Sequence, residues 1–487
     1  MKKVLSLIGM AALFSLIGAN LAAAANGTIT GVVKNIVTGA AIIGATVNDG
    51  NKGSTTTDVN GVYTLSEPAG SYTLTTSATG YQTTTQLSTV VAGVATTNNW
   101  SLTAAYGNQP IPAANMNYSI LAWSDLGMHC DQWDFSYFML LPPSNNLRVQ
   151  VFQRGSKSNP VTTGITVSYA FPKKTDSTLH TNWWTFQNQY GFNKPANIGY
   201  TGTPMAGTMP VDPANLSFHV TAIPLTPWDD DGTWDPYGTA TITVKDLNGN
   251  VLQTASVSAP GSTEMNCGNC HGSQTVSIEL DILQKHDAHN GTTLAADYAN
   301  GILHPCNMCH SDNAMIPPAP GQAGVESLSL ALHNWHKDKM NYNSVSAATS
   351  PDCFNCHPGP QTQCLRGIMA RAGKTCHDCH GDLYQMAIDM QNGRQPWLQL
   401  PKCSKCHDAV HAENANTLYR NSILNNAPSS SMNGKLYCQG CHSCTHGEYI
   451  STLPQDQTIP QQFQGDGYWI WNCTVCHTNK GVQNMHH

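Results

Sequence analysis

The chain has 487 residues, of which 11 % are charged and 40 % hydrophobic, and its formal net charge is -7. This length predicts about three domains. A net negative charge disfavours nucleic acid and anionic membranes as partners, so we expect no nucleic-acid binding. The sparse charge, together with 41 glycines, is typical of β-structure and loops.

The first 25 residues predict a secretory signal peptide. Lys2 and Lys3 form a positive start, an apolar run continues to Leu21, and small residues follow as far as Ala25. This pattern is cleaved from exported proteins. The first cysteine, Cys130, lies too far away for a lipid anchor, and no later run is long and apolar enough for a transmembrane anchor. We expect export to the cell exterior or outer-membrane surface, with the periplasm as the alternative.

Residues 26–104 predict an all-β sandwich domain. Short threonine- and valine-rich runs alternate with turn residues, and Asn60-Gly61 between two such runs predicts a β-hairpin. The domain resembles the carboxypeptidase regulatory-like family in its Thr38-Gly39 turn and in residues 44–47, 58–65 and 78–81. The resemblance implies a transthyretin-type sandwich without catalytic activity, which acts as a spacer or docking module. Residues 104–115 predict a linker.

Residues 116–262 predict a second β-rich, sandwich-like domain. Residues 147–151 and 239–244 alternate as half-buried strands do, and Asn248-Gly249 predicts a hairpin. The acidic run 229–231 is either a calcium site or a solvated loop, and His129-Cys130 is either a pair of metal ligands or a packed pair. We favour the second interpretation of each.

Seven Cys-x-x-Cys-His motifs occupy the last 221 residues. This motif is the attachment signature of c-type haem, in which the thiols bond to the vinyl groups and the histidine is the proximal iron ligand. Zinc also binds paired cysteines, but a zinc site does not require a histidine after every second cysteine. We therefore predict seven covalently attached haem c groups. The cysteines are Cys267, Cys270, Cys306, Cys309, Cys353, Cys356, Cys376, Cys379, Cys403, Cys406, Cys438, Cys441, Cys473 and Cys476, and the proximal histidines are His271, His310, His357, His380, His407, His442 and His477.

The motif-bearing residues 263–487 predict a mostly helical or irregular multihaem domain. So little chain for each cofactor cannot build an ordinary apolar core, so the porphyrins are expected to form much of it. The expected helices span residues 276–286, 328–337, 365–372 and 383–391. The short interval between Cys353 and Cys376 predicts one closely stacked haem pair.

A haem that only carries electrons needs a second axial ligand, whereas an open position makes a reaction site. The motif region holds 17 of the 20 histidines. His333 and His336 lie three residues apart on an expected helix, so they share a face and can serve two haems. We expect all or nearly all sites to be bis-histidine, with low potentials. The candidate distal ligands are His286, His289, His304, His333, His336, His411 and His446.

Three cysteines remain outside the motifs: Cys130, Cys364 and Cys444. A structural disulfide or buried thiols are expected for them. A long-spaced haem motif that joins Cys364 to Cys379-His380 is an alternative.

The run 121–130 and residues 356–366 and 418–422 resemble the secreted multihaem c-type cytochromes of metal-respiring bacteria, over about residues 116–480. The resemblance implies electron transfer to extracellular acceptors such as metal oxides or to partner cytochromes, and self-association into haem filaments in some relatives. The chain has Ser443-Cys444-Thr445-His446 where relatives have Ser-Pro-His, and it lacks their Gly-His pair before Cys438. One distal ligand is therefore expected to differ.

Three functions remain open: an electron carrier, a reductase of nitrite, hydroxylamine or tetrathionate with one open haem, and a subunit of a haem-containing filament. Multihaem reductases often mark the active haem with Cys-x-x-Cys-Lys or another unusual motif. Every motif here ends in histidine, so we favour an electron carrier over an enzyme. A filament is compatible with that function.

Overall fold

The computed structural model describes residues 26–35, 39–50, 53–78, 81, 83–102, 117–156, 158–339, 353–359, 361–401, 403, 406–407 and 436–478. The predicted signal peptide, the predicted linker and the candidate ligand His411 lie outside these residues. The chain divides into two compact units, Met1–Ala105 and Tyr106–His487. Within the described part of the chain, no helix combines the length and apolar character needed to cross a membrane.

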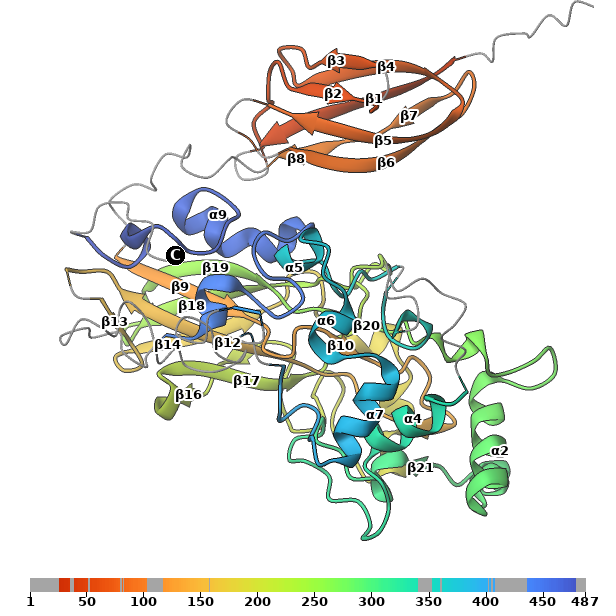
Figure 1. Cartoon of the computed structure of the whole chain (residues 1–487). Helices are drawn as coiled ribbons and strands as arrows, with labels where there is room; N and C mark the ends of the chain where they lie inside the picture. Colours follow the sequence, from red (N-terminus) through yellow and green to blue (C-terminus); the bar gives the residue numbers. More distant parts are fainter. Residues whose placement is uncertain are drawn as a thin grey trace, which may run out of the picture. The chain divides into compact units, whose positions relative to one another are not determined.

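The first unit contains two four-stranded sheets (Figure 1). In one sheet, β1 pairs antiparallel with β4 and parallel with β7 and β8. Side chains alternate between buried and exposed along β4, so each sheet contributes one apolar face to a shared core that includes Ile29, Val47 and Leu74. The predicted N-terminal sandwich is confirmed. Its strands are β1 (Asn26–Asn35), β4 (Val62–Pro68), β7 (Ala95–Thr97) and β8 (Trp100–Leu102) in one sheet, and β3 (Ser54–Thr56), β2 (Thr46–Asn48), β5 (Gly70–Ser77) and β6 (Thr84–Val90) in the other.

The turn at Asn60-Gly61 does not form the predicted hairpin. The strands before and after it, β3 and β4, belong to different sheets, because β4 pairs along the long strand β1. The Asp58 carboxylate accepts the backbone N–H groups of Asn60 and Val62, each at 2.8 Å, and Gly61 has φ +74°. The turn is therefore closed locally and leads from one sheet to the other.

The second unit contains two larger sheets that share one apolar core. Val149 and Phe218 of the first sheet and Val167 and Ile242 of the second belong to the same buried cluster. β18 and β19 are antiparallel neighbours, which confirms the hairpin at Asn248-Gly249. The first sheet holds β9 (Tyr118–Trp123), β12 (Asn145–Gln153), β13 (Asn159–Pro160), β16 (Val211–Asp212) and β17 (Ser217–Ile223), and the second β14 (Ile165–Ala170), β15 (Gly207–Thr208), β18 (Thr239–Asp246) and β19 (Val251–Ser258).

Two short parallel pairs connect this β-rich part to the rest of the unit. β10 (His129–Cys130) pairs with β20 (Gly261–Ser262), and β11 (Phe138–Met139) pairs with β21 (His304–Pro305). The core cluster also includes Tyr437, Ile459, Phe463 and Val475 from the motif-bearing segment. The domain boundary predicted near residue 263 therefore lies inside one compact unit, because the β-strands and the last two motifs bury their apolar side chains together.

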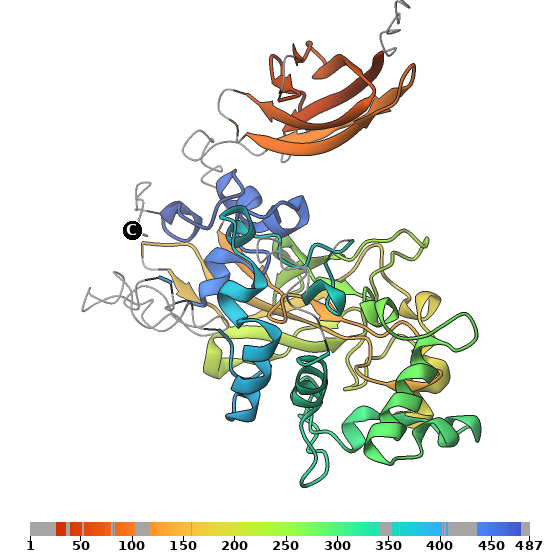
Figure 2. The same ribbon diagram turned by 45° about the vertical axis from the view of Figure 1, so that its right-hand side comes forward.

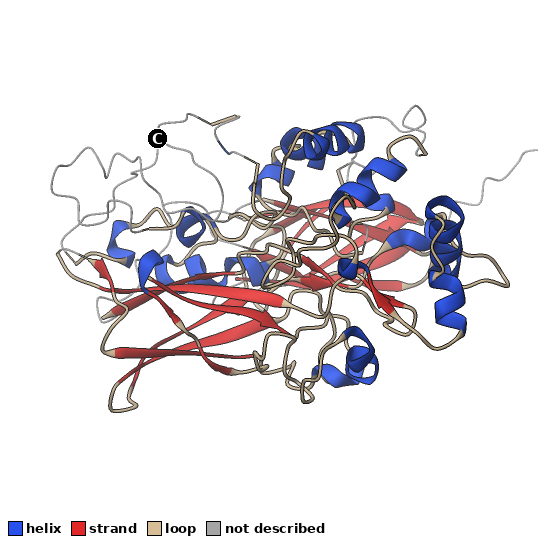
Figure 3. Cartoon of the chain, turned by 90° about the horizontal axis from the view of Figure 1, so that it is seen from below, coloured by secondary structure: helices blue, strands red, loops and turns tan. Residues whose placement is uncertain are grey.

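The motif-bearing segment is helical and irregular. Figure 3 shows its helices as short pieces joined by loops, and in Figures 1 and 2 helix α2 lies at the opposite end of the unit from β13. Helix α4 lies beside α7, and α9 lies on β19. The helices of the unit are α1 (Trp183–Phe186), α2 (Ile278–Asn290), α3 (Leu294–Ala299), α4 (Leu328–His336), α5 (Ile368–Arg371), α6 (Cys376–His380), α7 (Leu383–Gln391), α8 (Cys438–His442) and α9 (Thr458–Gln464).

Candidate cofactor-binding sites

All seven Cys-x-x-Cys-His motifs adopt one kind of backbone turn. In five of them the histidine N–H donates to the carbonyl of the first cysteine at 2.8–3.0 Å, and the other two motifs form the short helices α6 and α8. Residues three apart lie side by side in such a turn, so each motif presents its two thiols together. The five motifs with this bond begin at Cys267, Cys306, Cys353, Cys403 and Cys473.

Four of the motif histidines face a second imidazole at almost the same distance. Two imidazoles on opposite sides of one metal ion have ring centres roughly 6.2 Å apart, given bonds of about 2.0 Å and a ring centre about 1.1 Å behind each nitrogen. The observed pairs match this separation, so each leaves room for one ion between its rings. The centroid distances are 6.2 Å for His271–His336, 6.3 Å for His310–His286, 6.2 Å for His357–His333 and 6.2 Å for His380–His446.

Helix α4 supplies two of these imidazoles. It begins after Ser327, whose hydroxyl accepts the N–H of Leu330. The Nδ1 atoms of His333 and His336 each lie 2.7 Å from the carbonyl oxygen four residues earlier. A carbonyl only accepts, so Nδ1 must carry the proton, and the lone pair on Nε2 remains available for a metal.

Helix α2 contacts both of the first two motifs. His286 of this helix is the partner of His310, whose own Nδ1 lies 2.7 Å from the carbonyl oxygen of Glu326. Five residues earlier in the helix, Asp281 Oδ2 lies 3.0 Å from Nδ1 of His271. The hydrogen bond from Lys285, with the backbone N–H of Gly272 and with His271, lowers the pKa of Asp281 to about 2.

His357 and His446, one from each of the other two pairs, have lowered pKa values. Burial, followed by the nearby His380 and Arg366, lowers the pKa of His446 to about 3. Burial and the neighbouring His333 lower the pKa of His357 to about 4. Both imidazoles therefore stay neutral, which is the form that binds metals.

The remaining candidate ligands make other contacts. The ring of His289 lies 3.9 Å from that of Trp335, and Nε2 of His304 lies 3.0 Å from Oδ2 of Asp297. The ring centroid of His442, at the sixth motif, lies 6.5 Å from Trp469 at an interplanar angle of 30°. Nothing in the sequence pattern singled out Trp469 or Asp281.

His407 and His477 close the fifth and seventh motifs through the common turn. Within the described ranges, no three or more His, Cys, Asp or Glu side chains gather into a group suited to a metal ion.

Motifs that are distant in sequence meet in space. Asn266, directly before the first motif, donates its backbone N–H to the carbonyl of Cys356 at 3.3 Å and its side chain to the carbonyl of Phe354 at 2.8 Å. Ile470, just before the seventh motif, donates its N–H to the carbonyl of Cys441 at 2.9 Å. The first and third motifs, and the sixth and seventh, are therefore direct neighbours.

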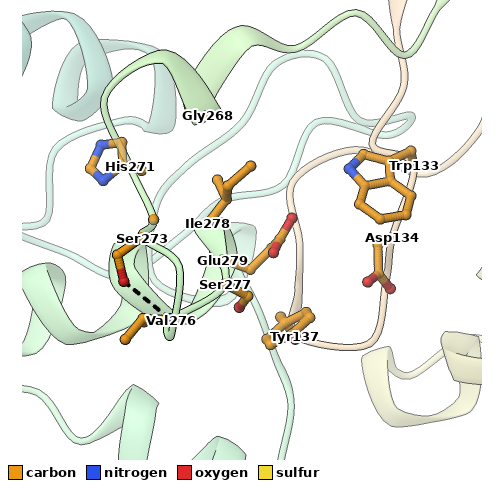
Figure 4. A pocket seen from close by; sticks show the side chains of 11 residues that line it. Trp133, Asp134, Tyr137, Gly268, His271, Ser273, Val276, Ser277, Ile278 and Glu279 are labelled. Carbon is orange, nitrogen blue, oxygen red and sulfur yellow. Dashed lines mark hydrogen bonds between the residues drawn. The ribbon is translucent and has the colours of Figure 1, made fainter.

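Two cavities border the motifs. One of about 540 Å³ lies beside the first motif, and Figure 4 shows His271 and Trp133 on its opposite sides with Ile278 and Glu279 between them. The other, of about 320 Å³, is lined by Phe354 of the third motif and by Arg366. Their walls combine aromatic, apolar and charged side chains.

Residues outside the motifs have structural roles. Cys130, Cys364 and Cys444 are free thiols, and burial raises the pKa of Cys364 and of Cys444 to about 12. Cys364 Sγ lies 3.7 Å from Nδ1 of His446. His129 packs in the interior with its Nε2 3.0 Å from Asp131.

The acidic run 229–231 is engaged by protein donors. Asp229 pairs with Lys174 at 3.2 Å and is buried rather than solvated. Asp230 accepts the backbone N–H of Thr175 at 2.8 Å, and Asp231 accepts that of Thr233 at 2.9 Å. These carboxylates hold the loop together.

Residues 28–103 match the carboxypeptidase regulatory-like domain family, in agreement with the resemblance found in the sequence. No curated protein matches the chain. Among solved structures, a DUF3823 family protein from Bacteroides ovatus is 12 % identical over 49 % of this chain and 99 % of its own, with a TM-score of 0.15. The major pilin subunit of Bacillus cereus is 9 % identical over 48 % of this chain and 69 % of its own, with a TM-score of 0.15. Scores this low carry no argument about fold or function.

Proposed function

We propose that the chain is an exported multihaem c-type cytochrome that carries electrons along seven covalently attached haems. The observation that carries this proposal is the set of four motif histidines that each face a second imidazole at 6.2–6.3 Å. That separation fits a single metal ion bound by both rings. The uniform turn of the seven motifs supports the proposal further.

The cysteine pairs of the motifs would hold the haems through thioether bonds, and the four imidazole pairs would be axial ligands. When bound, each haem supplies an iron that accepts and releases one electron. Two imidazoles at this separation would suit an iron whose other ligands come from the haem. A structural zinc site instead needs four tetrahedral ligands.

The protein side chains have two roles in this proposal. Hydrogen bonds at Nδ1 of His333 and His336 fix the rings with Nε2 presented to the metal. The lowered pKa values of His357 and His446 keep these imidazoles neutral and able to bind a metal. A site with both axial positions occupied exchanges no ligand with a substrate, which favours electron transfer over catalysis.

Contacts between motifs favour a continuous path. The first and third motifs touch through Asn266, and the sixth and seventh through Ile470. We propose extracellular metal oxides or partner cytochromes as the acceptors. The reductase and the filament subunit remain the alternative functions.

The decisive experiment is production of the full chain in a host with cytochrome c maturation. Mass spectrometry and the pyridine haemochrome spectrum should give seven haems, and the Cys267→Ala/Cys270→Ala variant should give six. Carbon monoxide should leave the spectrum of the dithionite-reduced protein unchanged. A carbon monoxide shift worth one haem in seven would favour the reductase, and bound zinc in place of haem would refute the proposal.

A further inference from the structure

The imidazole pairs differ in what their Nδ1 atoms bind. Nδ1 of His310, His333 and His336 bonds to neutral backbone carbonyls. His271 instead bonds to the carboxylate of Asp281 at 3.0 Å. The site at the first motif therefore has an anionic hydrogen-bond acceptor on its proximal histidine.

The structure holds this carboxylate firmly. Asp281 lies in the first turn of α2, which begins after the capping residue Ser277, and the positive end of the helix dipole favours a negative charge there. Its second oxygen accepts Lys285 Nζ at 2.6 Å, and the backbone N–H of Gly272 donates to Oδ2 at 3.1 Å. The side chains of His271 and Asp281 are each 18 % exposed, so the pair is partly shielded from solvent.

A carboxylate acceptor on a metal-bound imidazole raises the basicity of the ligand. The more basic ligand, and the negative charge behind it, stabilise the more positive oxidation state of the iron. We propose that Asp281 is a positioning residue that lowers the reduction potential of the haem attached at Cys267 and Cys270. This inference rests on the proposed function.

The third motif lies next to the first, so its haem is the nearest candidate acceptor for an electron from the first site. Asn266 joins the first motif to the third, and α4 carries His336 for the first site and His333 for the third. An electron on the haem at Cys267 is therefore beside the haem at Cys353, where the distal imidazole bonds to a neutral carbonyl. The proposed effect of Asp281 would favour electron transfer from the first site to the third.

Asp281→Asn tests the inference, because asparagine keeps the size of the side chain and removes its charge. In a spectroelectrochemical titration of the seven-haem protein, one seventh of the absorbance change should move to higher potential. We expect about a tenfold change in that redox equilibrium, which is about 59 mV for one electron. Asp281→Glu should restore most of the shift, and Lys285→Gln should move the same fraction to lower potential.

Asp297→Asn is the matched control, because it removes a His–carboxylate contact of the same 3.0 Å length, to His304. It should leave the titration unchanged. An unchanged titration for Asp281→Asn in a protein with seven haems, or an equal shift for Asp297→Asn, would overturn the role of Asp281 alone. Absence of haem from the wild type would instead overturn the proposed function.

Discussion

Asp456→Asn should strongly destabilise the second unit. Asp456 accepts two hydrogen bonds from Arg366, at 2.7 and 2.8 Å, and both side chains have no exposed surface. Burial alone would lower the pKa of Arg366, but the Asp456 carboxylate outweighs it and raises that pKa. The guanidinium also lies 4.5 Å from the ring centre of Tyr237. The substitution therefore leaves a full positive charge in the interior without its counter-charge.

Removal of one partner from a buried ion pair costs about 3–5 kcal/mol. With a guanidinium chloride dependence of roughly 4 kcal/mol per molar, the unfolding midpoint should fall by about 1 M. Far-UV circular dichroism and tryptophan fluorescence should be recorded together, because coincident transitions test the two-state assumption. Lys374→Gln is a suitable control, since its pair with Asp378 is exposed at 3.5 Å and should contribute about 0–1 kcal/mol.

The double variant Arg366→Met/Asp456→Leu distinguishes two causes of destabilisation, the unpaired buried charge and the loss of packing. Because it removes both charges, its midpoint should lie above that of Asp456→Asn. A midpoint for Asp456→Asn close to that of Lys374→Gln, or a double variant that loses as much as the single one, would refute the reasoning.

Two further predictions concern the β-rich parts. A Cβ added at Gly127 (φ +73°) would lie 2.6 Å from the carbonyl oxygen of Thr445, whereas Gly164 has the same φ and nothing within 4 Å. Gly127→Ala should therefore lower the thermal midpoint clearly more than Gly164→Ala; equal losses would mean that φ alone matters. The Asn250 side chain and neighbouring backbone N–H groups lower the pKa of Asp246 in the β18–β19 hairpin. Its stabilising contribution should be complete above about pH 4 and disappear as the pH falls through the lowered pKa, so Asp246→Asn should show a flatter acid limb in a stability–pH profile.

Local sequence signals predicted the helices well where the helix ends carry their own caps. Helix α7 has the predicted bounds, because the Asp382 side chain accepts the N–H of Gln385 at its start. The helix predicted at 365–372 begins only at Ile368. The predicted first turn does not form because Arg366 binds Asp456 in a buried ion pair. Gly367, which precedes the helix, has an extended backbone. Burial of a distant partner outweighed local propensity there.

The sequence predicted which histidines belong to the candidate sites, but it did not predict which two histidines face each other. The three-residue spacing placed His333 and His336 on one face of a helix, yet their partners His357 and His271 lie in different motifs. Which imidazoles meet depends on contacts between remote segments, such as Asn266 with the third motif. The hairpin predicted at Asn60-Gly61 is absent for a similar reason, because pairing with β1 decides which sheet β4 joins.

Helix α4 makes two sites mechanically inseparable. His333 and His336 are separated along the axis by about 4.5 Å, at 1.5 Å of rise per residue, and the covalent backbone fixes that offset. Any sliding or tilting of α4 against α7 must carry both imidazoles at once. The first and third sites therefore gain or lose their second imidazole as one event, so a single packing interface governs the integrity of two centres.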